Sequence, residues 1–106
     1  MAASTRPRNQ KRKATRESAR RREDYARLAQ LIARARTEFS KEKPSQARLA
    51  ELIGTDQTWV AKAERGARRV DLLELIEMLD ALEIDIHDFI DLLRRHRLER
   101  PIRKDR

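Results

Sequence analysis

The residues of this chain best suited to contacting DNA bases lie in one short predicted helix, residues 57–65. Gln57 can bond bidentately to adenine, and Lys62 can donate to guanine O6 and N7 or to a phosphate. Thr58 offers a hydroxyl and a methyl group suited to thymine, and Ala61 leaves room for close approach. At ~100° per residue, these side chains share the outward side of the helix. The alternative interpretation is a polar face that meets only solvent.

A second short helix and a tight turn must position that face. Residues 46–53 form the preceding helix. Ser45 and Asp56 stand at the N-cap positions of the two helices, where their side-chain oxygens can accept unpaired backbone N–H groups. Gly54 and Gly66 are the only glycines of the chain. Each falls just past a helix end, where a left-handed residue is needed.

Small and apolar residues indicate how these two helices pack. Ala50 is small where the helices must cross closely. Trp59 lies at the edge of the buried face, and we expect packing there in preference to a sugar or base contact. The pattern is that of a helix-turn-helix whose second helix enters the major groove of DNA. The positions predicted to point inward are Leu49, Ile53, Val60 and Ala63.

The whole motif, residues 45–66, reads SQARLAELIGTDQTWVAKAERG. It resembles the phage repressor/Cro-type (xenobiotic-response-element, XRE) helix-turn-helix family of bacterial transcriptional regulators. The match runs S-Q-x-x-L-A-x-x-I-G, then a polar cap, then x-x-x-V-x-K-x-E-R-G, and the resemblance extends over residues 28–93. It implies an all-α, five-helix repressor-like (lambda repressor-like) domain that binds double-stranded DNA.

The resemblance also implies roles for residues around the motif. Arg36 is expected to form a buried structural ion pair with Glu64, and Gln46 to bond a phosphate while it buttresses the second helix of the motif. Arginine suits phosphate because its planar guanidinium presents forked donors. Further phosphate contacts are predicted for residues that flank the groove-entering helix, namely Arg48, Thr55, Arg65, Arg68 and Arg69.

The charge is distributed unevenly along a chain whose formal net charge is +8. Residues 1–22 hold nine Lys or Arg, one Glu and almost no apolar content beyond alanine, so we expect a disordered basic arm. Residues 70–92 hold eight acidic residues and no Lys or Arg, and residues 96–106 form a basic tail. The acidic block must face away from any bound DNA. The arm either contacts phosphates or a minor groove, or is a solvated tail.

Three further helices complete the predicted domain, which spans residues 23–95. Asp71 and Asp85 are expected to cap the last two helices, and the first can begin as early as Ser18. The fourth helix carries a wider apolar surface than one core needs, and the extra apolar surface of the fourth and fifth helices offers a seam for a homodimer. Apolar periodicity places the three helices at residues 23–38, 72–82 and 86–95.

Other classes of protein receive no support from the 106 residues. There is no cysteine, hence no disulfide framework, and no apolar run approaches the ~18 residues of a membrane helix. No nucleophile–base pair, glycine-rich phosphate loop or metal-ligand spacing appears. We therefore expect no enzyme activity, no catalytic residue, no metal and no cofactor. A cytoplasmic, nucleoid-associated location is the simplest expectation.

These observations favour a sequence-specific DNA-binding transcriptional regulator. A repressor that reads a palindromic operator as a dimer is expected, because one motif reads only a few base pairs. One alternative is an antitoxin that binds a toxin protein through its acidic block and also binds its own operator. Another is a non-specific nucleoid or RNA-binding protein that relies on its basic ends.

Overall fold

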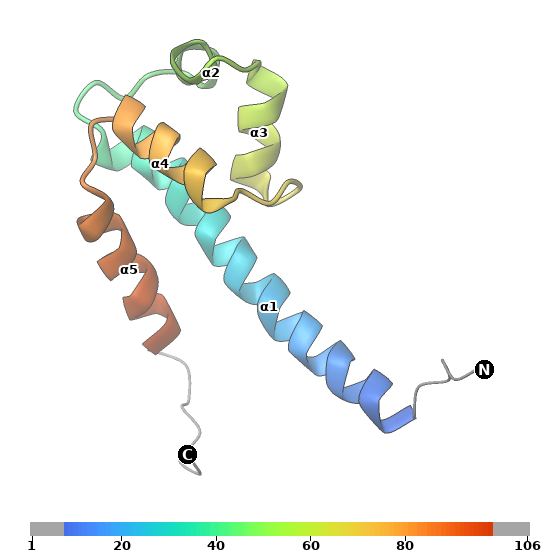
Figure 1. Ribbon diagram of the computed structural model, residues 1–106. Coiled ribbons are helices and arrows are strands. Elements are labelled where there is room, and N and C mark those ends of the chain that lie inside the picture. Colours follow the sequence, from blue (N-terminus) through green and yellow to red (C-terminus); the bar gives the residue numbers. More distant parts are fainter. Residues whose placement is uncertain (1–7, 99–106) are drawn as a thin grey trace.

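The structure, a computed structural model, describes residues 8–98 of the chain. Over this range it is all-helical without strands, and the five α-helices predicted from the sequence are confirmed (Figure 1). One additional π-helical turn, η1, follows the first helix. The elements are α1 (Arg8–Arg34), η1 (Ala35–Phe39), α2 (Gln46–Ile53), α3 (Gln57–Arg65), α4 (Leu72–Ala81) and α5 (Ile86–Leu98).

The first helix, α1, is the longest element and extends well beyond the rest of the domain (Figure 1). It begins at Arg8, so residues 8–22 are helical where a disordered basic arm was predicted. No glycine or proline interrupts the helix, and its Ala, Arg, Lys and Glu residues have high helix propensity. Residues 1–7 of the predicted arm lie outside the described residues.

The end of the first helical segment is also irregular. One helix over residues 23–38 was predicted, but the last turn widens into the π-helix η1, whose residue Ala35 is fully buried. The N–H of Ser40 closes this turn by donating to the carbonyl of Ala35 at 2.8 Å. Lys43, with φ of 48°, and Pro44 then lead the chain into α2. This connection sets where Arg36 stands relative to α3.

Local signals define the ends of α2 and α3 as the sequence predicted. The side chain of Ser45 accepts a hydrogen bond from the N–H of Arg48 at 3.0 Å, and that of Asp56 from the N–H of Trp59 at 2.8 Å. Gly66, at φ of 78°, adopts the left-handed conformation after α3. A Cβ there would sit 3.6 Å from the Cβ of Ala29, so the end of α3 passes close to α1.

One core joins all five α-helices. Its largest fully buried side chains each contribute about 1.5–3 kcal/mol to folding, so this cluster fastens the motif to α1 and α4. They are Leu31 and Ile32 of α1, Leu49 of α2, Val60 of α3, Met78 and Leu79 of α4, and Phe89 of α5.

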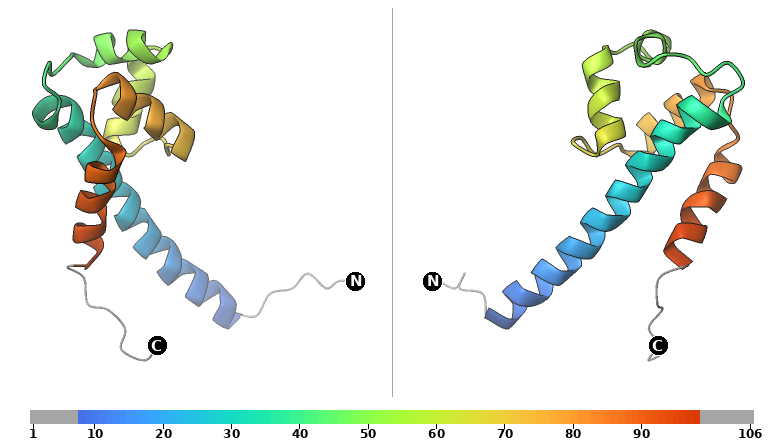
Figure 2. Two further views of the ribbon diagram at one scale, coloured as in Figure 1. Left: turned by 60° about the vertical axis from the view of Figure 1, so that its left-hand side comes forward. Right: turned by 180° about the vertical axis from the view of Figure 1, so that it is seen from behind.

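The last helix, α5, packs on the other side of α1 from α3, whereas α4 lies against α2 of the motif. A capping box starts α4: the carboxylate of Asp71 accepts from the N–H of Glu74, whose side chain accepts from the N–H of Asp71. Asp85 accepts from the N–H of His87 at 2.7 Å near the start of α5. α3 and α5 lie on opposite sides of α1 in each view of Figure 2.

The chain ends beyond α5, which continues to Leu98. Residues 96–98 of the predicted basic tail are therefore helical, and residues 99–106 lie outside the described residues. Across residues 8–98, no helix has the length and apolar character that crossing a membrane requires.

Candidate nucleic-acid interface

The outward face of α3 carries the four predicted base-contact residues. Gln57, Thr58 and Lys62 are exposed, and Ala61 is half-buried beside them. The opposite face is anchored in the core through Val60 and Ala63, which are at most 1% exposed. The helix therefore presents a polar side to solvent while its apolar side fixes its rotation. The arrangement suits insertion into a major groove, which admits one α-helix.

An ion pair fixes the far end of α3 to the segment after α1. Nε of Arg36 donates to Oε2 of Glu64 at 2.6 Å, and Nη2 donates to Oε1 at 3.0 Å. The side chains are only 15% and 6% exposed, respectively. Nη1 of Arg36 also donates to the carbonyl of Pro44 at 3.1 Å, so one guanidinium joins η1, the connection before α2, and α3. The pair that the family resemblance implied is thus present.

The hydrogen bond that Arg36 donates to Glu64 is the main cause of the raised pKa of Arg36. Burial alone would lower the pKa of this guanidinium, but the hydrogen bond and the negative charge of Glu64 outweigh it. Arg36 therefore stays charged at every physiological pH. Its role is structural, because it lies beneath the outward face of α3 and is largely covered.

Gln46 continues this network towards the outward face. Its amide Nε2 donates to Oε1 of Glu64 at 2.9 Å, and its Oε1 accepts from Nε2 of Gln57 at 3.4 Å. A line of contacts therefore runs from Arg36 through Glu64 and Gln46 to Gln57, the first residue of α3. Gln46 was predicted to start the first helix of the motif and to buttress the second, but the hydrogen bond to Gln57 was not foreseen. It holds the predicted adenine-contacting side chain in a defined place.

The residues predicted to contact phosphates lie around α3, and they differ in exposure and in the partners they now contact. Arg48 pairs with Glu51 at 2.8 Å, with both side chains more than half exposed. Arg65 is exposed in the last turn of α3. Thr55 is half-buried in the turn, where its N–H donates to the carbonyl of Ala50 at 2.8 Å. Exposed ion pairs contribute at most about 1 kcal/mol, so Arg48 can exchange its partner for a phosphate.

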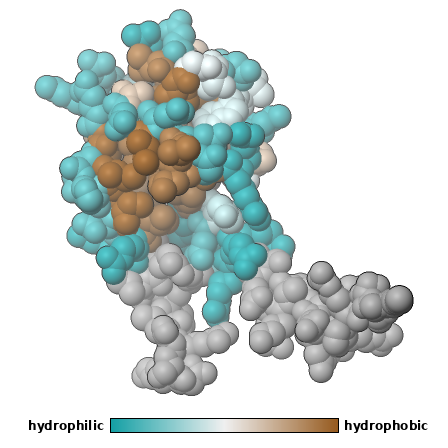
Figure 3. Space-filling model, in the orientation of Figure 1, coloured by the Kyte–Doolittle hydropathy of each residue, from teal (hydrophilic) through white to brown (hydrophobic). Residues whose placement is uncertain are grey.

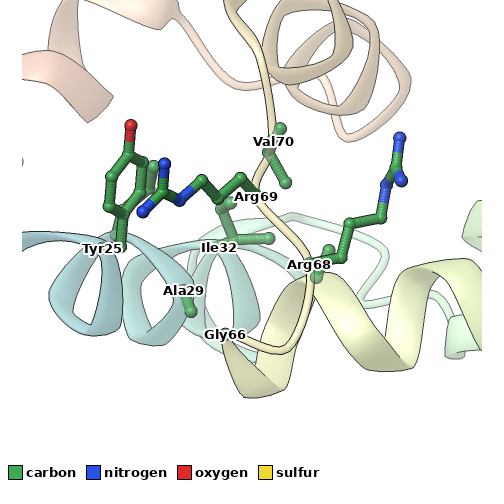
Figure 4. Close-up of a pocket in the computed structure, with 9 residues that line it drawn as sticks. Tyr25, Ala29, Ile32, Gly66, Arg68, Arg69 and Val70 are labelled. Atoms are coloured by element: carbon green, nitrogen blue, oxygen red, sulfur yellow. The ribbon is translucent and has the colours of Figure 1, made fainter. Parts of the chain in front are cut away.

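The side chains of Arg68 and Arg69, in the loop after Gly66, point in different directions (Figure 4). The guanidinium of Arg69 lies over the ring of Tyr25 on α1, 4.4 Å from its centroid. Arg68 points the other way, where it pairs with Glu74 at 3.0 Å and lies 5.0 Å from the ring centroid of Trp59. Such cation–π contacts contribute about 0.5–1 kcal/mol at exposed sites. Both residues therefore brace the loop as well as flanking α3.

These two stacking contacts were missed by the sequence analysis. Tyr25 lies far from Arg69 in the sequence, and no local pattern connects them. Trp59 is half-buried against the core, as predicted, with Arg68 over its ring. The hollow between this loop and α1, beside Tyr25 and Arg69, has a volume of only about 10 Å³, enough for about one water. It has no room for a small-molecule ligand.

One solved structure places this fold among known proteins. The chain is similar to the restriction-modification controller protein C.AhdI from Aeromonas hydrophila, known from a high-resolution crystal structure. The two share 31% sequence identity over 64% of this chain and 94% of that one, with a TM-score of 0.57. C.AhdI is an XRE-type helix-turn-helix regulator.

The chain belongs to the XRE family of helix-turn-helix regulators. The resemblance seen in residues 45–66 is therefore confirmed, together with the repressor-like all-α fold. No family model and no curated protein matches the chain. As an XRE protein, it is a DNA-binding transcriptional regulator. The toxin partner of the antitoxin alternative gains no support from this neighbour.

Proposed function

We propose that the chain is a sequence-specific transcriptional repressor of the controller-protein type that binds a palindromic operator as a homodimer. One observation carries the proposal: the exposed face of α3 is held in a fixed orientation by the buried Arg36–Glu64 pair below it. A recognition helix must keep its side chains in register with base edges, and this pair prevents α3 from rotating or tilting.

The base-contacting chemistry follows from the groups that α3 leaves available. The amide of Gln57 has two N–H donors and a carbonyl acceptor. One N–H is donated to Gln46, so the other N–H and the carbonyl remain for N7 and N6 of an adenine. Lys62 donates to guanine one turn further along the helix. Thr58 and Ala61 lie close enough to the same groove to contact thymine methyl groups.

Phosphate contacts flank this face and supply affinity without sequence preference. Gln46 and Thr55 lie at the N-terminal side of α3, and Arg65 lies in its last turn. Arg48 and Arg68 reach phosphates by leaving their carboxylate partners, and Arg69 does so from its place over Tyr25. Each such phosphate contact makes binding more sensitive to salt, because it releases condensed counterions.

A second copy of the chain is the proposed occupant of an apolar surface on α4 and α5. Leu72 and Leu73 are 63% and 72% exposed at the start of α4. Figure 3 shows a broad apolar area over these helices on the face seen in Figure 1. A single motif reads few base pairs, and a two-fold dimer places two α3 helices on half-sites about 34 Å apart. The exposed leucines provide the apolar contact that such a dimer needs.

Selection of a random duplex library on the purified protein tests the proposal. A salt concentration of about 150 mM keeps non-specific phosphate binding from dominating. We expect a palindromic consensus, and we expect the protein to reduce transcription in vitro when that sequence overlaps a promoter. Binding without any consensus would overturn the sequence-specific function. A consensus from which transcription rises would retain sequence reading and overturn repression.

A further inference from the structure

The N-terminal half of α1, residues 8–22, extends away from the rest of the domain (Figure 1). Among the α1 side chains that the structure describes, the first that packs against the core cluster is Leu28, whereas the helix begins at Arg8. At 1.5 Å per residue, residues 8–22 form about 22 Å of helix before Tyr25, which stacks on Arg69. The exposed side chains of Arg20, Arg21 and Arg22 lie in this segment. Because the segment projects from the domain, its composition calls for an explanation other than packing.

The composition is that of a polyanion-binding helix. Residues 8–22 hold eight Lys or Arg and one Glu. Four of the arginines recur at every fourth position, the spacing at which residues share one face of an α-helix. Like charges at that spacing destabilise an isolated helix, and an anionic surface beside them would reverse this effect. The four are Arg8, Arg12, Arg16 and Arg20.

The direction of this helix brings it to the side of the domain that α3 occupies. In Figure 1 and in the reverse view of Figure 2, the N-terminal half of α1 projects past the C-terminal end of α3, on the same side as α3. Two contacts fix this crossing. Gly66 leaves its backbone close to the Cβ of Ala29, and Arg69 stacks on Tyr25 at 4.4 Å. The direction of α1 is thereby coupled to the recognition helix.

We infer that the N-terminal half of α1 is a second DNA-binding element, a basic helix that lies along the phosphate backbone flanking the half-site read by α3. This inference rests on the proposed function. The segment is about 22 Å long, about two thirds of the ~34 Å turn of B-DNA, so it extends the contact by up to about that fraction of a turn. It contributes affinity and no base preference, because its contacts are electrostatic.

Three variants of the full chain separate charge from helical structure. The triple variant Arg12→Gln, Arg16→Gln and Arg20→Gln removes charge and keeps good helix formers. Ala19→Pro keeps every charge but breaks the helix before the packed part of α1. Ala19→Gln is the matched control, because it changes the same position without breaking the helix. The measurements are hydroxyl-radical footprints on the selected operator and operator affinity as a function of salt.

We expect the unmodified chain and Ala19→Gln to protect phosphates outside the half-sites. The triple variant should lose this flanking protection, and the slope of log affinity against log salt should fall by about 3 per protomer. Ala19→Pro should also lose the flanking protection although its charge is unchanged. In all variants the consensus sequence and the protection of the half-sites should stay the same.

Two outcomes would overturn the inference while the proposed function stands. In one, the unmodified chain protects only the half-sites. In the other, Ala19→Pro protects the flanks as well as the unmodified chain does, which would indicate a charged tail whose helical structure is irrelevant. Failure of the proposed function is distinct, because the unmodified chain would then give neither a consensus nor protected half-sites.

Discussion

Arg36 and Glu64 meet as a bidentate pair although 28 residues separate them in the sequence. Their hydrogen bonds, at 2.6 and 3.0 Å, join the π-helical turn after α1 to the last turn of α3. The same carboxylate accepts from Gln46, which in turn contacts Gln57. The buried pair thus supports, through Gln46, the side chain of Gln57, which is proposed to contact an adenine.

Removing one member of this pair should destabilise the fold. Arg36→Ala leaves the carboxylate of Glu64 covered and without its charged partner, at an expected loss of about 3–5 kcal/mol in the free energy of unfolding. Urea denaturation followed by circular dichroism measures this loss. Glu51→Gln, which breaks the exposed pair with Arg48, is the control and should change stability by less than about 1 kcal/mol. Equal losses in both variants would contradict a special role for the buried pair.

The raised pKa of Arg36 gives this contribution a defined pH dependence. A group whose pKa is higher in the folded state stabilises the fold fully below its unfolded pKa, and this contribution is lost as pH rises through the folded pKa. Both pKa values of arginine lie far in the alkaline range. Arg36→Ala should therefore lower stability by the same amount at pH 6 and pH 8, within about 0.5 kcal/mol, in paired denaturation curves. A loss of stability that differs between these two pH values would contradict the conclusion that Arg36 stays charged throughout this range.

Replacing Glu83 by glycine should stabilise the protein. Glu83 has φ of 59° at the end of α4, a left-handed conformation that costs a residue with Cβ about 1–2 kcal/mol. Glu83→Gly removes this strain but makes the unfolded chain more flexible, so we expect a net gain of about 0.5–1 kcal/mol. Glu77→Gly inside α4 is the control and should destabilise by about 1 kcal/mol. Thermal unfolding of both variants gives the comparison.

Lys62 and Arg48 should affect DNA binding in different ways. Lys62→Ala should relax the preference for one base pair by about 1–3 kcal/mol, because its proposed partner is a guanine edge. Arg48→Ala should weaken binding equally for all sequences and lower the salt slope by about 1. Competition binding with single-base operator variants separates the two patterns. If Lys62→Ala instead weakened binding equally for all operator variants, Lys62 would contact a phosphate and not a guanine.

In the proposed complex, the ion pair of Arg68 with Glu74 competes with a contact between Arg68 and a phosphate. Glu74→Gln removes the charge of this partner and keeps an oxygen that can accept from the N–H of Asp71, so the capping box is retained. Because the ion pair is exposed, we expect operator affinity to rise by at most about fivefold. The same substitution made with Arg68→Ala should have no such effect. A rise that persists without Arg68 would reflect only the general loss of negative charge.

The exposed leucines of α4 should control the oligomeric state. Leu72→Gln with Leu73→Gln should yield a monomer in sedimentation velocity, with little change in thermal stability, because these side chains are mostly exposed in a single chain. Leu52→Gln, at a position that is 46% exposed on α2, is the control and should leave the dimer intact. A double variant that still sediments as a dimer would place the interface elsewhere.

The motif was predictable because its signals act over a few residues. Ser45 and Asp56 each cap a helix by accepting an N–H three residues later, and the two glycines allow left-handed turns at the helix ends. The bounds of α2 and α3 therefore match the predicted ranges. The outward face of α3 followed from the same periodicity, because the buried Val60 and Ala63 fix which side meets solvent. Its contacts with DNA stay predictions.

The extent of α1 was not predictable in the same way. A low apolar content indicates that a segment cannot fold alone, and residues 8–22 were expected to be disordered for this reason. In the structure they continue a helix whose later turns are held by the core, so helix propagation needs no new nucleus. The π-helical turn after Arg34 likewise depends on how the chain packs around the buried Ala35.

The sequence by itself determined the bounds and caps of α2 and α3 and the chemical types on the outward face of α3, since these depend on neighbours one turn away. Only the tertiary structure decided which distant side chains meet. It placed Gln46 between Glu64 and Gln57, set Arg69 on Tyr25, and turned the N-terminal half of α1 to the side of α3. The physical reason is that such contacts follow from how one shared core orients all the helices, and no local hydrogen bond or periodicity encodes that orientation.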